Sequence, residues 1–253
     1  MQFPGYTIIN GVYHNDRNTI PQQFEERYLA ARAREGRVYD DATVKLLPEV
    51  PAGHLLEQEW ALRKESALRL LHYCKKNQPK TILEIGCGNG WLSHMLAGAG
   101  NNEVTGVDVN LQELEQAARV FGRDGLSFLL DEFTSPLFTD RRWDMIVFAA
   151  SIQYFPSLKD IITLALGRLN TAGALHILDT HFYPKDAVAA AKQRSLDYYT
   201  SVGVPEMAAA YFHHSTEELN AFPHRLLYDP KSLLNRLKGC RSPFPWICIK
   251  GER

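Results

Sequence analysis

The middle of the chain alternates between short apolar runs and longer segments whose apolar residues recur every three or four positions. The short runs are typical of buried strands, and they lie at 81–85, 103–107, 126–130, 143–149 and 174–179. The periodic segments between them predict amphipathic helices at 90–97, 111–121 and 158–169. Strands that alternate with helices need crossover connections, so the pattern predicts an α/β fold with a doubly wound, mostly parallel sheet and helices on both faces.

Capping signals mark two of these helix starts. Asn110 followed by Glu113 resembles a capping pair, and Ser157 followed by Asp160 has the same spacing. A side chain that accepts a hydrogen bond from the first helical turn satisfies a backbone donor that has no partner inside the helix. We therefore predict that the two helices begin directly after Asn110 and Ser157.

Before residue 80 the pattern is helical rather than alternating. One helix is expected to begin at Thr19–Pro21 and to end at Gly36, and a short one to follow Asp41. The strongest periodic segment runs from 55 to 75, and its apolar face carries Leu56, Trp60, Ala67, Leu70, Leu71 and Cys74. We predict an N-terminal helical extension or lid over 1–54 and the main domain over 55–253.

After the fifth apolar run the pattern becomes less regular. Residues 185–200 and 205–213 are predicted to be helical, and 216–221 to add a short helical turn. These segments form a predicted helical insert over about 183–222. Two further strands are expected at 225–228 and 243–250, which brings the predicted sheet to seven strands.

Composition and charge exclude several classes of protein. The 253 residues carry a formal net charge of −1 and no dense cluster of Lys and Arg, so we expect no nucleic-acid partner. No apolar run approaches the ~20 residues that span a bilayer, and the N-terminus lacks a basic region followed by a hydrophobic one, so we expect a cytoplasmic protein without membrane contact. The four cysteines form no Cys-x-x-Cys pair, which argues against a disulfide framework or a zinc site.

One stretch, 83–93, carries the clearest chemical signal. Its sequence LEIGCGNGWLS ends an apolar strand, places glycines at positions 86, 88 and 90, and resumes as a helix. Glycines at alternate positions allow the backbone to pass close to a ligand and to direct N–H groups at it. A dinucleotide site is typically Gly-x-Gly-x-x-Gly, so the Gly-x-Gly-x-Gly spacing makes a nicotinamide-dependent dehydrogenase an unfavoured alternative.

Acidic residues follow the next two predicted strands. Asp108 ends the second strand, where a carboxylate can accept hydrogen bonds from the hydroxyls of a ribose. Asp131 and Glu132 follow the third strand at the same edge of the sheet. Ligands of open α/β sheets bind at the carboxyl ends of the strands, so these acids and the glycine turn predict one nucleotide-like cofactor site.

In this order and spacing, the segments resemble the class I S-adenosylmethionine-dependent methyltransferases. The resemblance covers 80–182 and rests on five segments: EIGCGNG, GVDVN, LLDEF, RRWDMIVFAAS and LNTAGALHILDT. It implies a Rossmann-like seven-stranded sheet, S-adenosylmethionine as cofactor and S-adenosylhomocysteine (SAH) as product. The combination is specific for the family and uninformative about any one member.

The resemblance also implies roles for individual residues. The methionine end of the cofactor would lie over the glycine turn, with Ala149 or Ala150 beside it. Asp108 would bind the ribose, Val109 would pack on the adenine, Asp131 would accept from the adenine amino group, and Glu132 would offer its backbone. The residues expected to hold the cofactor are therefore Glu84, Gly86, Cys87, Gly88, Gly90, Asp108, Val109, Asp131, Glu132 and Ala149. Asp131 has a structural alternative, because an aspartate at that position can simply begin a turn.

A sulfonium methyl is already activated, so the reaction needs alignment and a dry site more than a nucleophile or a metal. A general base is needed only for an acceptor that must lose a proton. We predict His181, directly after the fifth strand, as the first candidate and Tyr154 as the second. Ser151, Gln153, His213 and His214 are weaker candidates. Only Asp179 is available as an acid after the fourth and fifth strands, so no metal is expected.

The acceptor is predicted by elimination. The segment AASIQYF after the fourth strand lacks the Asn/Asp-Pro-Pro-Tyr and Pro-Cys motifs of methyltransferases that act on amide nitrogens and on bases. We therefore expect a small-molecule acceptor, under a lid formed by the N-terminal helices and the aromatic residues of the insert.

Arg63 has two possible roles: its stem packs while its head lies in water, or its head meets a carboxylate of the ligand. The alternative function is a non-catalytic SAM- or SAH-binding regulatory or scaffold protein. The sequence carries no signal for the oligomeric state.

Overall fold

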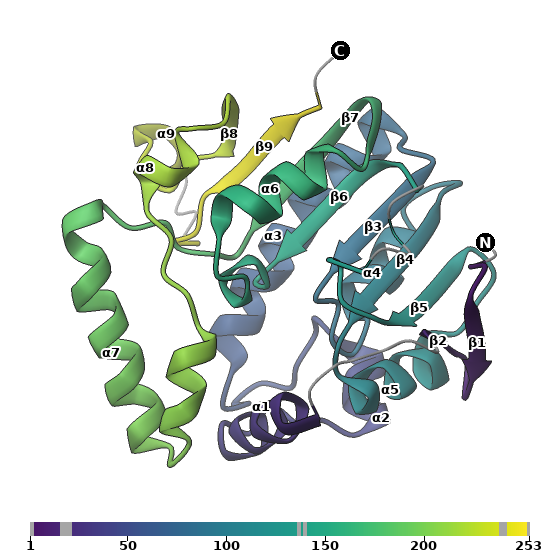
Figure 1. The fold of residues 1–253 in the computed structure, drawn as a ribbon, viewed down its shortest axis with the longest axis horizontal. Helices are drawn as coiled ribbons and strands as arrows, with labels where there is room; N and C mark the ends of the chain where they lie inside the picture. The colour runs from purple at the N-terminus through teal and green to yellow at the C-terminus, as the bar shows by residue number, and fades with distance from the viewer. Residues whose placement is uncertain (1–2, 16–21, 136–137, 139–140, 238–241, 252–253) are drawn as a thin grey trace.

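A computed structural model describes residues 3–15, 22–135, 138, 141–237 and 242–251. The helix start predicted at Thr19–Pro21 lies outside these residues. The described chain forms one nine-stranded sheet, in the order β1-β2-β5-β4-β3-β6-β7-β9-β8, with helices on both faces (Figure 1). None of the helices within the described ranges is both long enough and apolar enough to cross a bilayer.

Five parallel strands form the centre of the sheet. In spatial order they are β5 (Leu126–Leu130), β4 (Glu103–Asp108), β3 (Thr81–Ile85), β6 (Trp143–Ala149) and β7 (Leu169–Leu178). The predicted strands 81–85, 126–130 and 143–149 have the predicted bounds. β7 starts earlier than predicted, at Leu169, because its first residues pair with the start of β6 before a shift in register.

The two C-terminal strands complete the predicted set of seven. β9 (Trp246–Lys250) pairs antiparallel with β7, and β8 (His224–Tyr228) pairs antiparallel with β9. The chain order at this edge places β9 between β7 and β8. The prediction of a mostly parallel α/β sheet is therefore confirmed.

The predicted strand count and the predicted N-terminal segment need correction. Residues 1–54 are not purely helical, because β1 (Tyr6–Ile9) and β2 (Val12–Asn15) form a hairpin, and β2 pairs parallel with β5. Asn10 and Gly11 make the turn with φ of 51° and 81°. Asn-Gly with both φ values positive is the favoured two-residue hairpin turn. The sheet therefore has nine strands instead of seven.

The helices pack in two layers because the buried strands direct alternate side chains to opposite faces. One face is covered by α3 (Glu57–Asn77), α4 (Trp91–Ala97) and α5 (Leu111–Phe121), which share a core with Ile82 of β3. The other face is covered by α6 (Leu158–Leu166), whose Ile161 and Ile162 pack with Leu83 of β3.

The predicted helix starts are confirmed. The side chain of Asn110 accepts from the backbone N–H of Glu113, and the side chain of Ser157 accepts from that of Asp160. The α5 helix ends before Gly122, as predicted. Both caps lie just beyond the carboxyl ends of strands, so the helices begin at the edge where the functional residues gather.

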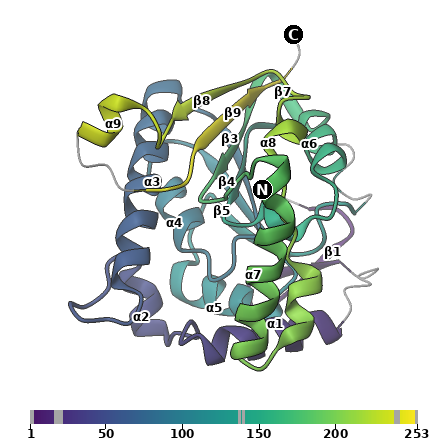
Figure 2. The same cartoon turned by 90° about the vertical axis from the view of Figure 1, so that its left-hand side faces the viewer.

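Outside the two layers, the N-terminal helix and the insert pack on each other. Ala31 of α1 (Gln22–Arg34) shares a small core with Tyr199, Val204 and Met207 of the insert. Figure 2 shows α1 below the sheet, near the lower end of α7. The remaining elements are α2 (Asp41–Leu46), η2 (Ile152–Tyr154), η3 (Lys185–Ala187), α7 (Val188–Ser201), η4 (Pro205–Ala210), α8 (Thr216–Leu219) and α9 (Leu233–Leu237). The helix predicted at 205–213 is the 3₁₀ segment η4, which is shorter.

Candidate functional site

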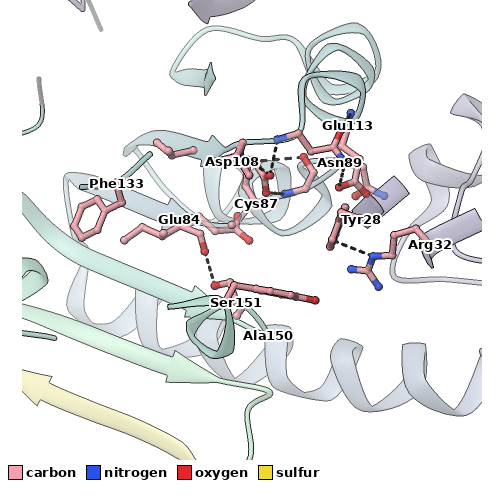
Figure 3. Close-up of a pocket in the computed structure, with 18 of the residues that line it drawn as sticks. Tyr28, Arg32, Glu84, Cys87, Asn89, Asp108, Glu113, Phe133, Ala150 and Ser151 are labelled. Atoms are coloured by element: carbon pink, nitrogen blue, oxygen red, sulfur yellow. Dashed lines mark hydrogen bonds between the residues drawn. The ribbon is translucent and has the colours of Figure 1, made fainter. Parts of the chain in front are cut away.

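A cavity of about 470 Å³ lies at the carboxyl ends of β3, β4, β5 and β6. The glycine turn and the acids that follow the strands form its floor, and residues of α1 and α3 form its roof. Figure 3 shows Phe133 at one end, Tyr28 and Arg32 at the other, and Asp108, Cys87 and Asn89 between them. The cavity therefore has the elongated shape and the strand-end position expected of a cofactor site.

The glycine turn has a backbone that other residues would not tolerate. Gly86 and Gly90 have φ of 73° and 74°. A Cβ on Gly86 would lie 2.5 Å from Cβ of Ser151, and one on Gly90 would lie 2.6 Å from the ring of Phe128. Gly88, with φ of 51°, lines the cavity between them. Gly90 is not among the lining residues and instead allows α4 to start close against β5.

Asp108 holds the glycine turn and the start of α5 together. Its Oδ2 accepts from the N–H of Gly88 at 2.7 Å, and its Oδ1 accepts from those of Val109 at 2.8 Å and Asn110 at 3.0 Å. Burial raises the pKa of Asp108, and the three N–H groups oppose that effect. The carboxylate predicted to bind a ribose therefore also fixes the local backbone.

Glu84 lies beneath the turn and is 3% exposed. It accepts a hydrogen bond from the hydroxyl of Ser93 in α4. Burial raises the pKa of Glu84 to about 8, against the effect of that hydrogen bond. Burial also raises the pKa of the neighbouring Cys87 thiol. A buried acid with so high a pKa favours a cationic ligand, because a positive charge nearby stabilises the carboxylate.

Asp131 is held by the N-terminal hairpin, which the sequence did not predict. Its Oδ2 accepts from the hydroxyl of Tyr6 and from the Asn15 amide, the latter at 3.1 Å, and its Oδ1 accepts from the N–H of Glu132 at 2.7 Å. Burial and the bond to Asp131 raise the pKa of Tyr6. Asp131 and Glu132 line the cavity beside Phe133. The turn interpretation of Asp131 is thus incomplete, because its side chain also joins two distant segments.

The residues after β6 form the wall opposite the glycine turn. Ala149, Ala150 and Ser151 all line the cavity, and Ala150 has a φ of 54°. The hydroxyl of Ser151 donates to the carbonyl of Ile85, which fixes this wall to β3. Tyr154 of η2 also faces the cavity and packs edge-on against Tyr28 of α1, with ring centroids 6.0 Å apart.

The structure separates the two predicted candidates for a general base. Tyr154 lines the cavity, whereas His181 is not among the lining residues and packs on Phe244 with ring centroids 4.5 Å apart. Burial lowers the pKa of His181 and raises that of Tyr154. His213 contacts Ser195 and His214 contacts the carbonyl of Ile152, so neither belongs to the cavity lining.

Arginines line the roof of the cavity, and the sequence analysis named only one of them, Arg63, as a possible ligand contact. Arg32, Arg37 and Arg63 all line the cavity. Arg37 and Arg63 share the carboxylate of Glu59, at 2.5 and 2.9 Å. Burial acts against ionisation of Glu59, yet the two guanidinium groups lower its pKa to about 2. The head of Arg63 is therefore paired with Glu59 instead of extending into water, and it lines the cavity. The contact with a ligand carboxylate stays a prediction.

Arg32 and Tyr28 come from α1, one turn apart. The Nε of Arg32 donates to the hydroxyl of Tyr28 at 2.9 Å. Among the described residues, the acid closest to the Arg32 terminal nitrogens is Glu35, with Nη1 and Oε2 3.8 Å apart. The sequence analysis predicted neither as a site residue, because no local motif marks them.

Two observations test whether the floor suits a nucleoside cofactor. A Cβ on Gly86 would collide with Ser151, so glycine allows the turn to lie directly against the cavity wall that follows β6. Next to it, Oδ1 of Asn89 is buried without a hydrogen-bond partner. A close-lying backbone, carboxylates and an unsatisfied acceptor suit a ligand rich in hydroxyl and ammonium donors. The floor residues therefore fit the cofactor predicted from the sequence.

Comparisons with known proteins agree with this geometry. Residues 82–173 match the family model described as a methyltransferase domain. Over 100 residues, the chain is 33% identical to a malonyl-[acyl-carrier protein] O-methyltransferase of Priestia megaterium, which covers 39% of this chain and 36% of that protein. A second such enzyme, from Hamiltonella defensa, is 26% identical over 129 residues, or 51% of this chain and 48% of that protein. The chain thus spans less than half of the curated relatives it matches.

Solved structures resemble nearly the whole chain. The match with the structure of the plantazolicin methyltransferase in complex with SAH covers 91% of this chain and 97% of that protein's chain, with a TM-score of 0.53 and 14% identity. The magnesium protoporphyrin IX methyltransferase of Synechocystis with bound SAH covers 91% and 95%, with a TM-score of 0.54 and 12% identity. At such identities the likeness establishes the fold.

Proposed function

We propose that this chain is a class I methyltransferase that transfers a methyl group from S-adenosylmethionine to a small acceptor. Its residues 82–173 match a methyltransferase-domain model, and its fold resembles that of solved methyltransferases. The observation that carries the proposal is the convergence of the glycine turn, Asp108 and Asp131 on one cavity. All three lie within the segment that matches the family model.

The floor residues would bind the cofactor in one direction. Asp108 would accept from the ribose, and Val109 and Phe133 would enclose the adenine beside Asp131 and Glu132. The backbone of the glycine turn and Ala149 would border the methionine end, above Glu84. S-adenosylmethionine, when bound, supplies a methyl group already activated on a cationic sulfur. An acidic floor favours that positive charge.

The chain itself would supply alignment and exclude water. Correct orientation of two reactants can account for about 7–11 kcal/mol of a barrier. The rings of Tyr28 and Tyr154 would position the acceptor under the roof. Of Tyr154 and His181, the two predicted candidates for a general base, we choose Tyr154, because it lines the cavity and His181 does not. With burial raising its pKa, Tyr154 is neutral near pH 7 and would act as a hydrogen-bond donor that orients the acceptor.

The N-terminal helix α1 would act as a lid that closes on the acceptor. Glu25 accepts from the N–H of Leu111 at 2.8 Å, which ties α1 to the start of α5. At its other end, Arg34 donates to the carbonyl of Val202 at 3.0 Å, and Glu35 accepts from Tyr198 at 2.8 Å. The contacts of Arg34 and Glu35 are exposed, where such interactions are weak. The bond from Glu25 is partly buried, so opening the lid would break that bond and uncover the small core around Ala31.

The acceptor would be a small organic molecule that carries an anionic group. Three arginines, Arg32, Arg37 and Arg63, line the roof, and their guanidinium groups would meet the anionic group. The acids of the roof are Glu35 and Glu59, which pair with these arginines, and Glu25, which also lines the cavity. Two curated relatives carry the name malonyl-[acyl-carrier protein] O-methyltransferase, and a malonyl group ends in a carboxylate. A carboxylate acceptor would need no base, because it is already deprotonated at neutral pH.

The decisive experiment is a transfer assay. Purified protein is incubated with methyl-labelled S-adenosylmethionine and a fractionated extract, and products are searched by mass spectrometry for the gain of one labelled methyl group. Transfer that requires the protein supports the proposal and excludes a scaffold that only binds the cofactor. SAH binding without transfer to any fraction would favour that non-catalytic alternative.

A further inference from the structure

The three bonds to Asp108 limit what it can offer a ligand. A carboxylate has about four lone-pair positions. Val109 and Asn110 occupy two of them on Oδ1, and Gly88 occupies one on Oδ2. One position is left, whereas the two neighbouring hydroxyls of a ribose bring two donors. A second acceptor is therefore needed if both hydroxyls are to be bound.

Glu113, in the first turn of α5, lies beside the same glycine. A Cβ on Gly88 would be 3.4 Å from Oε2 of Glu113, while the N–H of Gly88 binds Asp108. Both carboxylates therefore lie against one residue of the glycine turn, and both line the cavity. Figure 3 shows Glu113 and Asn89 on the same side of the cavity as Asp108.

The Glu113 carboxylate accepts few hydrogen bonds from the protein, although it lies in the cavity wall. Within the described chain, its side chain accepts one long bond, from the amide of Asn110 at 3.3 Å. Burial raises the pKa of Glu113 to about 7, and the charge of Asp108 adds to that effect while Arg32 opposes it. The neighbouring Asn89 Oδ1 is buried and unpaired as well. A largely buried carboxylate with one long hydrogen bond still has positions for donors brought by a ligand.

We propose that Glu113 is the second carboxylate of the ribose subsite, so that one ribose hydroxyl donates to Asp108 and the other to Glu113. This inference rests on the proposed cofactor-dependent function and assigns a binding role that the family resemblance did not give to this residue. The capping role of Asn110 is compatible with it, because the cap uses the backbone N–H of Glu113.

The arrangement links cofactor binding to pH and to the lid. The charged or titratable groups that act on Glu113 are Asp108 and Arg32, and its own charge acts on Tyr28, Tyr154 and Cys87. A hydroxyl that donates to Glu113 stabilises the charged carboxylate and lowers its pKa. Binding is then coupled to loss of a proton, and affinity increases as the pH rises through about 7. Arg32 lowers the pKa of Glu113 and belongs to α1, so the position of α1 also affects this loss of a proton.

Nucleosides that lack single hydroxyls test the inference. Adenosine, 2′-deoxyadenosine and 3′-deoxyadenosine compete with labelled SAH for wild-type protein, Glu113→Ala and the matched control Glu115→Ala on the same helix. Wild type and control should lose roughly tenfold or more in affinity when either hydroxyl is removed. Glu113→Ala should lose discrimination at one hydroxyl and keep it at the other.

A second variant covers the case in which Glu113→Ala does not fold. Glu113→Gln keeps the shape, and its SAH affinity should rise less between about pH 6 and 8 than that of wild type, which improves severalfold. Glu84, with a pKa of about 8, titrates in both proteins and contributes equally to both profiles. Failure of wild type to bind SAH at all contradicts the proposed function. If wild type binds SAH, and the Glu113 variants keep both hydroxyl preferences and the pH profile of wild type, this inference alone is overturned.

Discussion

The floor and the roof of the cavity are built on different physical principles. The floor is backbone: a turn with positive φ at Gly86, Gly88 and Gly90, fixed by a carboxylate that accepts three N–H groups. The roof is made of side chains, mainly Tyr28, Arg32 and Arg63, from helices that precede the parallel strands. Its helix α1 is anchored by polar contacts at either end.

The difference separates what is shared from what is particular to this chain. The family match covers 82–173 and therefore the floor, whereas α1 and η4 lie outside it. A rigid floor suits a cofactor of fixed shape. A roof of long side chains can be altered without disturbing the backbone of that floor, which suits selection of the acceptor.

The largest effect is expected when a single methyl group is added to the glycine turn of the floor. Gly86→Ala places a methyl group 2.5 Å from Ser151 at a φ of 73°. Backbone strain and overpacking together should cost about 2–5 kcal/mol of unfolding free energy and abolish SAH binding. Denaturant titration and calorimetry measure both. Gly100→Ala, where a Cβ would meet nothing within 4 Å, is the control and should be neutral.

The second-largest effect is expected at Asp108, whose carboxylate fixes the backbone of the floor. Asp108→Asn removes the charge that accepts from Gly88, Val109 and Asn110. Loss of charged hydrogen bonds should weaken SAH binding by about 1–3 kcal/mol, or roughly five- to 150-fold. Asp124→Asn, at an exposed position, should leave the affinity unchanged. Equal affinities for both variants would refute the ribose assignment.

The third prediction concerns pH and the acid under the turn. The pKa of Glu84 in the folded protein, about 8, lies above its ordinary value of 4.5. Between these values the folded state holds a proton that the unfolded state has lost, so stability should fall as pH rises, by at most about 1.4 kcal/mol per pH unit. Melting temperatures should show this decline for wild type and a shallower one for Glu84→Gln. Identical slopes would contradict the buried-acid description.

The smallest effect is expected at the roof. Glu25→Ala removes the acceptor for the N–H of Leu111 and loosens α1 from α5. This partly buried hydrogen bond should contribute about 0.5–1.5 kcal/mol, so SAH affinity should change less than about tenfold. Stopped-flow measurement should show faster SAH dissociation. A loss as large as that of Asp108→Asn would mean that the roof is as essential as the floor.

The sequence predicted the floor well because its signals are local. Strands such as 81–85 and caps such as Asn110 depend on neighbouring residues, and the sheet edge follows from their order. The hairpin was missed because its two four-residue strands are too short for a periodic signal, although Asn10-Gly11 is a strong turn signal.

The roof could not be predicted from the sequence in the same way. Arg32 lines the cavity only because α1 docks on α5 and the insert, and no local pattern encodes that contact. His181 was ranked by its position after a strand, but the chain turns there and the side chain packs on Phe244. Tyr154 lines the cavity because η2 turns back over the end of β6.

The central claim is that the floor binds the cofactor of class I methyltransferases. Isothermal titration of the wild-type protein with SAH tests it most directly. The account predicts one site per chain and an affinity that falls roughly fivefold or more in Asp108→Asn. No binding heat and no stabilisation against thermal unfolding at millimolar SAH would contradict it.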